Sequence, residues 1–146
     1  MTPAEPRYLL ATDTALTLLR ADAPVALKAK VRDARPGTLW LSAITEAQLR
    51  SRLRDFEYST LRSQALEILC RNVATVPFDR SAAMARAELS LDTTVSDALN
   101  ETELLVAAHA SSIDAVLVTL SPYWTAVTGL RTENWCTDAS VDQVSA

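Results

Sequence analysis

Glycine is scarce in this chain, with only two among 146 residues. So few glycines argue against a glycine-rich phosphate-binding loop and against an all-β fold with many tight turns. Cysteine is equally scarce, because Cys70 and Cys136 are the only two and they form no CxxC pair. A disulfide framework is therefore not expected. The single histidine, His109, makes a zinc site improbable and is expected to have a structural, packed role in a helix.

Long apolar runs and targeting signals are also missing. No apolar run approaches the roughly 20 residues of a membrane span, and the start MTPAEPRYLL lacks a charged-then-apolar signal pattern. The net charge is −4, so nucleic acid would have to bind a local basic patch against an unfavourable overall field. We therefore expect a reduced, cytoplasmic protein with no membrane partner.

The residues that are present predict one globular domain. Hydrophobic residues make up 49% of the chain and charged residues 22%. Short apolar runs alternate with helical patterns, which predicts strands at 8–11, 38–44, 73–79, 114–119 and 130–135. Helices are expected after Asp13 or Thr12 and at 25–31, 45–56, 61–68, 81–91 and 102–112. A loop is expected at 92–100, and a disordered polar tail at 137–146 follows a domain spanning 1–136.

This alternation predicts an α/β fold with a central parallel sheet. The expected strands are apolar throughout, which is typical of parallel strands covered by helices on both faces. Ligands of such sheets bind beyond the carboxyl ends of the strands. The positions to inspect are therefore Ala11–Asp13, Thr45–Gln48, the residues before Glu103, and Thr119–Ser121. At Ala11 the chain places a methyl group where an enzyme would be expected to place a charged side chain.

Four segments occur in order between residues 8 and 135: YLLATDTAL, LSAITEAQL, ELLVAAHA, and AVLVT followed by GLRTENW. In their order and spacing they resemble the PIN-domain family, and more narrowly the VapC toxins of bacterial toxin–antitoxin pairs. The resemblance implies a three-layer α/β/α fold and a metal-dependent endoribonuclease activity. It also implies a homodimer and an antitoxin partner.

The family's chemistry depends on acidic residues around Mg²⁺ or Mn²⁺, hard cations that prefer carboxylate oxygens and water. By the resemblance, Ala11 stands at the family's first aspartate, Gln48 at its glutamate and Glu103 at its next aspartate. The last acidic or amide position falls near Ser121. Only Glu103 keeps a charge, and one carboxylate is a poor magnesium site. The pocket is thus expected to be vestigial, with no cofactor.

These changes predict a catalytically inactive pseudo-ribonuclease that binds RNA or a partner protein. The alternative is a working endoribonuclease toxin that uses Mg²⁺ or Mn²⁺. It would need Asp13 and Glu101 as relocated metal ligands beside Glu103, or the chain would be an artificially inactivated toxin. A folded interaction or dimerisation module with no RNA role is a third interpretation.

Structural roles compete with these assignments. Asp13 is expected to cap the helix that follows it. Thr45 and Gln48 fit a capping box, in which glutamine serves nearly as well as glutamate. Asn100 and Glu103 fit a second capping pair.

Basic and apolar helix faces suggest binding partners. Arg50 and Arg54 share a helix face at i, i+4 and could hold RNA phosphates, although a solvated face is the other interpretation. Broad alanine and leucine faces, together with the family likeness, favour a homodimer. An antitoxin-like protein is the other expected partner.

Overall fold

A computed structural model describes residues 5–54, 59–89, 99–126 and 129–137 of the chain. Its centre is a sheet of five parallel strands in the order β3-β2-β1-β4-β5. The strands are β1 (Arg7–Leu10), β2 (Leu39–Ser42), β3 (Ala74–Val76), β4 (Ala115–Val118) and β5 (Thr132–Glu133). The helices are α1 (Thr12–Leu18), α2 (Val25–Asp33), α3 (Ala43–Leu53), α4 (Ser59–Asn72), α5 (Arg80–Glu88), α7 (Glu101–Ser112) and the 3₁₀ turn η1 (Pro122–Ala126).

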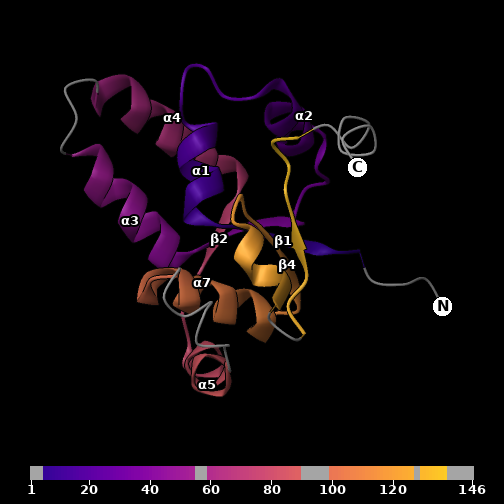
Figure 1. Ribbon diagram of the computed structural model, residues 1–146. Helices are drawn as coiled ribbons and strands as arrows, with labels where there is room; N and C mark the ends of the chain where they lie inside the picture. Colours follow the sequence, from indigo (N-terminus) through magenta and orange to yellow (C-terminus); the bar gives the residue numbers. More distant parts are fainter. Residues whose placement is uncertain (1–4, 55–58, 90–98, 127–128, 138–146) are drawn as a thin grey trace.

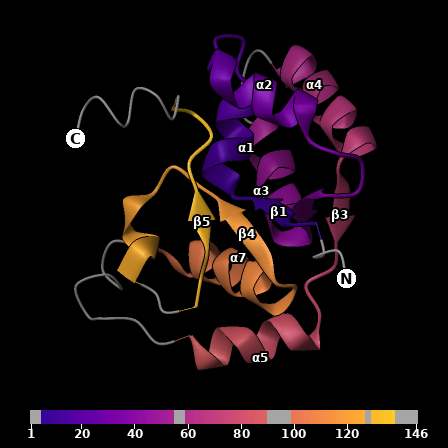
Figure 2. The same cartoon turned by 90° about the vertical axis from the view of Figure 1, so that its right-hand side faces the viewer.

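Helices cover both faces of the sheet, so the predicted three-layer α/β/α architecture is confirmed. Figures 1 and 2 show α1, α2 and α4 together on one side, and α7 with α5 outside it on the other. The alternation of side chains along β1 explains this arrangement. Leu10 belongs to the core under α1–α4, whereas its neighbour Leu9 belongs to the core under α7. Leu117 and Val118 divide in the same way on β4.

The expected elements are present with shifted boundaries. β1 is shifted by one residue, β2 to β5 are shorter than predicted, and the fourth helix, expected at 61–68, extends over Ser59–Asn72. Gly37 has φ +83° in the turn before β2. The expected loop at 92–100 lies largely outside the described residues, and so does the tail at 137–146 apart from Thr137. No helix in the described part of the chain is long and apolar enough to cross a membrane.

Two predicted helix caps are wrong. α1 begins after Ala11, whose side chain makes no capping bond, so neither Thr12 nor Asp13 is the N-cap. α3 begins after Ser42, whose hydroxyl accepts a hydrogen bond from the Ile44 N–H. The chain leaves β2 directly into the helix, so Thr45 lies inside α3 and is fully buried. The capping box of Thr45 and Gln48 therefore does not form.

His109 has the structural role expected of it, and its surroundings fix its charge state. The side chain is 1% exposed, and its Nδ1 lies 2.9 Å from the Ser42 hydroxyl oxygen. Because that oxygen already accepts from Ile44, its own proton is free to be donated to the imidazole. Phe78 packs edge-on against the ring, with centroids 5.3 Å apart. Burial lowers the pKa of His109, against the opposing effects of Asp79 and a backbone hydrogen bond with Pro77.

The lowered pKa predicts a pH-dependent stability. In the unfolded chain His109 takes up a proton near its ordinary pKa of 6.5, whereas in the folded protein burial lowers the pKa and the proton is taken up at a lower pH. The free energy of unfolding should therefore fall as the pH drops below about 6.5, until the lower pKa of the folded state is reached. Urea unfolding of the wild type and of His109→Gln between about pH 5 and pH 7.5 measures this.

The variant should be less stable by about 1–3 kcal/mol at neutral pH, because Ser42 loses its partner. Its stability should depend less steeply on pH than that of the wild type, since His109 is the only imidazole in the chain. Equal pH slopes for the two proteins would show that His109 does not titrate differently on folding.

Candidate functional site

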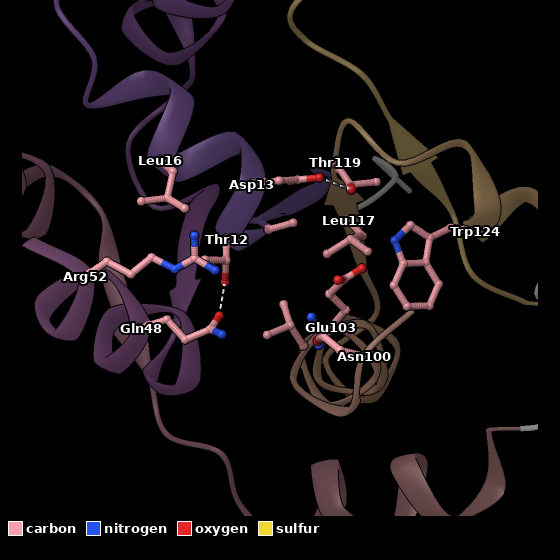
Figure 3. A pocket seen from close by; sticks show the side chains of 12 residues that line it. Thr12, Asp13, Leu16, Gln48, Arg52, Asn100, Glu103, Leu117, Thr119 and Trp124 are labelled. Carbon is pink, nitrogen blue, oxygen red and sulfur yellow. Dashed lines mark hydrogen bonds between the residues drawn. The ribbon is translucent and has the colours of Figure 1, made fainter. Parts of the chain in front are cut away.

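A cavity of about 170 Å³ opens at the carboxyl edge of the sheet, where β1 passes into α1 and β4 ends. Figure 3 shows its walls, which come from α1, α3, α7, β4 and η1. The lining residues are Ala11, Thr12, Asp13, Leu16, Gln48, Arg52, Asn100, Glu103, Val106, Leu117, Thr119 and Trp124. The cavity thus lies at the carboxyl ends of the strands, where ligands of parallel sheets are expected to bind.

Three of the four motif-matched positions lie in this cavity. Ala11, Gln48 and Glu103 all line it, although they come from three different parts of the chain. Ser121 is not among the lining residues, and Thr119, two residues earlier, takes part in its place. Glu101 is turned to another partner, because Arg86 holds its carboxylate through two hydrogen bonds of 2.9 and 2.8 Å.

Gln48 is held by its carbonyl oxygen. Figure 3 shows the contact, in which the Thr12 hydroxyl donates to Gln48 Oε1 at 2.6 Å. Thr45 Oγ1 lies 3.2 Å from the same hydroxyl oxygen. This contact uses one of the two acceptor positions of the Gln48 oxygen, and the amide N–H groups add two donors that can serve a ligand.

Asp13 links α1 to the end of β4 through hydrogen bonds to its two carboxylate oxygens, and we call this arrangement the bracket. One carboxylate oxygen accepts from the Thr14 N–H at 2.6 Å and the Thr14 hydroxyl at 3.1 Å. The other accepts from the Thr119 hydroxyl at 3.0 Å and the Leu120 N–H at 3.1 Å. A carboxylate has about four acceptor positions, so these contacts account for all of them. Asp13 is neither the predicted cap nor well placed to become a metal ligand.

Glu103 is the carboxylate that remains open to the cavity. Burial raises its pKa most, the negative charge of Asp13 adds to this, and a hydrogen bond from the Asn100 backbone opposes it. The Asn100 side-chain oxygen in turn accepts from the Glu103 N–H at 2.8 Å. The predicted pairing of Asn100 with Glu103 at this helix start is therefore confirmed.

Arg52 is the cavity residue that the sequence alone did not single out. Gln48 and Arg52 are four residues apart in α3, so they share a helix face, and both line the cavity. This spacing was the available signal. Arg50 instead pairs with Glu46 at 3.2 Å and with Glu67 at 2.8 Å, and Arg54 is exposed at the end of α3. Neither Arg50 nor Arg54 lines the cavity.

These donors do not suit a divalent metal ion. Nowhere in the described residues do three His, Cys, Asp or Glu side chains gather in a way that could hold one. The cavity itself offers one open carboxylate, from Glu103, because the oxygens of Asp13 are used in the bracket. The Arg52 guanidinium adds a fixed positive charge to the same hollow. Magnesium, which prefers several oxygen ligands, is poorly served here.

The bracket role of Asp13 predicts a loss of stability when its carboxylate is removed. Asp13→Ala should lower the free energy of unfolding by about 2–4 kcal/mol, because hydroxyl and N–H donors at the ends of two elements lose their acceptor. Asp33→Ala is the matched control, since Asp33 is exposed and pairs only with the neighbouring Arg32, so it should change stability by less than about 1 kcal/mol. Urea unfolding measures both. Equal effects of the two substitutions would contradict the bracket.

Comparison with known proteins gives the fold a name. No family model matches the sequence, and no curated protein sequence is significantly similar to it. Solved structures do match in shape. A chain of the DNA-bound VapBC structure from Salmonella typhimurium has a TM-score of 0.76 at 17% identity, with 90% of this chain and 100% of that chain covered. A chain of VapBC-1 from nontypeable Haemophilus influenzae has a TM-score of 0.73 at 22% identity, with 89% and 98% covered.

A third match is a chain of VapBC2 from Rickettsia felis bound to a DNA fragment from their promoter. Its TM-score is 0.72 at 20% identity, with 88% of this chain and 98% of that chain covered. At identities this low, the similarity of the structures establishes a common fold and nothing more. The chain therefore has a VapC-like PIN-domain fold.

Proposed function

We propose that this chain acts by binding an antitoxin-like protein and that it does not cleave RNA with a metal ion. The observation that carries the proposal is the donor set of the cavity. A single carboxylate, that of Glu103, is left for a cation, and Arg52 stands in the same hollow. Metal-assisted cleavage of a phosphodiester needs a cation that activates water and stabilises charge on the phosphate. This cavity holds such a cation poorly, so the working-toxin alternative is not favoured.

A second hollow supports a protein partner. It has a volume of about 590 Å³, is lined mainly by residues of α1, α2 and α4 and of the segment before β2, and shares no lining residue with the first cavity. We call it the α4 groove; its larger apolar side chains include Leu18, Leu19, Val31, Leu39, Ile68, Leu69 and Val73. On α4 itself, Ile68 is 56% exposed and Leu61, near the groove, is 73% exposed. Large apolar side chains this exposed on one helix are typical of a binding surface.

The rim of the α4 groove indicates the chemistry of the partner. Arg32, Arg35 and Arg71 border it, and two of them are already in ion pairs, Arg32 with Asp33 and Arg35 with Glu5. A second copy of the chain docked through the same face would bring the Arg71 side chains of both copies, which have no acidic partner among the described residues, to one interface, and this is unfavourable. An apolar segment with acidic flanks suits the groove better. The structural neighbours are VapBC assemblies, and this supports an antitoxin-like protein as the source of that segment. The homodimer and RNA binding stay predictions.

The first test concerns metal and RNA. Pure protein should cleave structured RNA no faster with millimolar Mg²⁺ or Mn²⁺ than with EDTA, because the cavity lacks the carboxylates that hold the cation. The same ions should leave the melting temperature unchanged to within about 1 °C. EDTA-sensitive cleavage that persists across independent preparations would refute the proposal.

A paired variant provides the positive control for this assay. Ala11→Asp with Gln48→Glu places two further carboxylates beside Glu103. Their mutual repulsion should lower the stability of the metal-free protein, and a bound cation should remove it. The double variant should therefore gain several degrees in melting temperature from Mn²⁺. No gain would mean that Ala11 and Gln48 do not face a common metal position.

The second test concerns the α4 groove. Ile68→Glu should weaken binding of the product of an adjacent open reading frame of antitoxin type by at least tenfold, about 1.4 kcal/mol, because a charge enters the apolar floor. Met84→Glu is the matched control, since Met84 is 55% exposed on α5, outside the groove. Titration calorimetry on the purified complex measures both. Equal losses for the two variants would place the partner elsewhere.

A further inference from the structure

Two opposite charges face each other across the cavity at the carboxyl edge of the sheet. Figure 3 shows the Glu103 carboxylate on the α7 side and the Arg52 guanidinium on the α3 side, with open space between them. Among the described residues, the Glu103 carboxylate accepts a backbone hydrogen bond from Asn100 but none from a side chain, and no acid pairs with Arg52, which is exposed to solvent. Each charge therefore lacks a counter-ion that the described part of the fold could supply.

An aromatic side chain also borders this space. Trp124 lines the cavity, and 2% of its surface is exposed. Figure 3 shows the ring nitrogen on the side of Trp124 that faces the cavity. An indole N–H is a hydrogen-bond donor only, so this side of the ring suits an acceptor group of a molecule held beside Glu103.

The remaining walls are apolar, and the space is small. Leu16, Val106 and Leu117 also line the cavity, together with the methyl group of Ala11. A volume of about 170 Å³ is below the roughly 300 Å³ at which pockets for drug-sized ligands begin. Low-dielectric walls strengthen the attraction between each charge and a bound group of opposite sign.

We infer that this cavity binds a small dipolar molecule of the aminocarboxylate class, without any metal ion. The carboxylate of the ligand pairs with the Arg52 guanidinium, assisted by the Gln48 amide, and its ammonium group pairs with the Glu103 carboxylate. A short apolar spacer packs on Leu16 and Leu117. The inference does not depend on an antitoxin-like partner, because the cavity and the α4 groove have no lining residue in common.

Ligands with one charge fit less well. An anion alone is repelled by Glu103 and by the nearby charge of Asp13, whereas a cation alone, including a divalent metal, leaves Arg52 without a partner and is repelled by it. Only a molecule with both charges satisfies both walls. A mononucleotide is also anionic at one end and rich in N–H donors at the other, but it is larger than the cavity suggests.

The experiment compares ligands of matched length on the full chain. Calorimetry or ligand-observed NMR would measure a series from glycine to 6-aminohexanoate, with hexanoate and hexylamine as single-charge analogues and CMP as the nucleotide. One member of the series should bind at least fivefold more tightly than both analogues, and EDTA should not change its affinity. No preference for the dipolar series, tighter binding of CMP, or tighter binding of Mn²⁺ would each overturn the inference.

Variants then test the roles of Arg52 and Glu103 in binding. Arg52→Gln and Glu103→Gln should each reduce the affinity for the best aminocarboxylate at least tenfold. Arg52→Gln should bind hexylamine at least as tightly as the wild type does, and Glu103→Gln should bind hexanoate at least as tightly. Arg54→Gln and Glu88→Gln are the matched controls, because both residues are exposed and neither lines the cavity. Melting curves confirm that each variant is folded. Loss of affinity in the controls, or its retention in Arg52→Gln and Glu103→Gln, would contradict the assignment.

Discussion

The carboxylate of Asp13 links the two chain segments at the sheet edge where the candidate site lies. β1 and β4 are neighbouring parallel strands, and their chains diverge at their carboxyl ends into α1 and into the loop before η1. Asp13 bridges this divergence by accepting from Thr14 on one side and from Thr119 and Leu120 on the other. The cavity exists because the two strand ends are held in place while the chain spreads around them.

The same bracket decides the charge balance of the cavity. Asp13 adds a negative charge that raises the pKa of Glu103, but its oxygens are occupied. A carboxylate at the position of Ala11 would stand next to both acids and would repel them in the absence of a cation. A methyl group at Ala11 and an amide at Gln48 avoid this repulsion. The cavity therefore carries less negative charge than it would with acids at these two positions, and Arg52 adds a positive charge to it.

The sequence was sufficient for the fold and for half of the site. Apolar runs such as the one at 115–118 predict buried parallel strands, and the edge at which such strands end predicts where Ala11, Gln48 and Glu103 meet. The role of Asp13 could not be read from local sequence, because Thr119 is 106 residues away and only the strand pairing brings it near. A carboxylate that follows a strand looks like a helix cap until its distant partners are known.

Helix register explains the other errors. The N-cap of α3 depends on where the chain leaves β2. Because the helix starts at Ala43 instead of Thr45, a different side chain accepts the hydrogen bond from the N–H groups of the first turn. The i, i+4 rule correctly groups Arg50 with Arg54, but it does not say which face of α3 is turned to the sheet edge. That face carries Gln48 and Arg52, since Leu49 and Leu53 must point into the core.

The helix α1 connects the two surfaces that the proposals concern. Within its seven residues, Thr12 and Leu16 line the cavity, while Leu18 borders the α4 groove together with the next residue, Leu19. Ala15, on the same helix, is fully buried and anchors the helix in the core. A protein segment in the groove and a small ligand in the cavity would therefore press on opposite ends of one short helix. Asp13 fixes the first turn of that helix to β4, so the bracket is one route by which the two surfaces can be coupled, and the packing of α3 on α4 is a second.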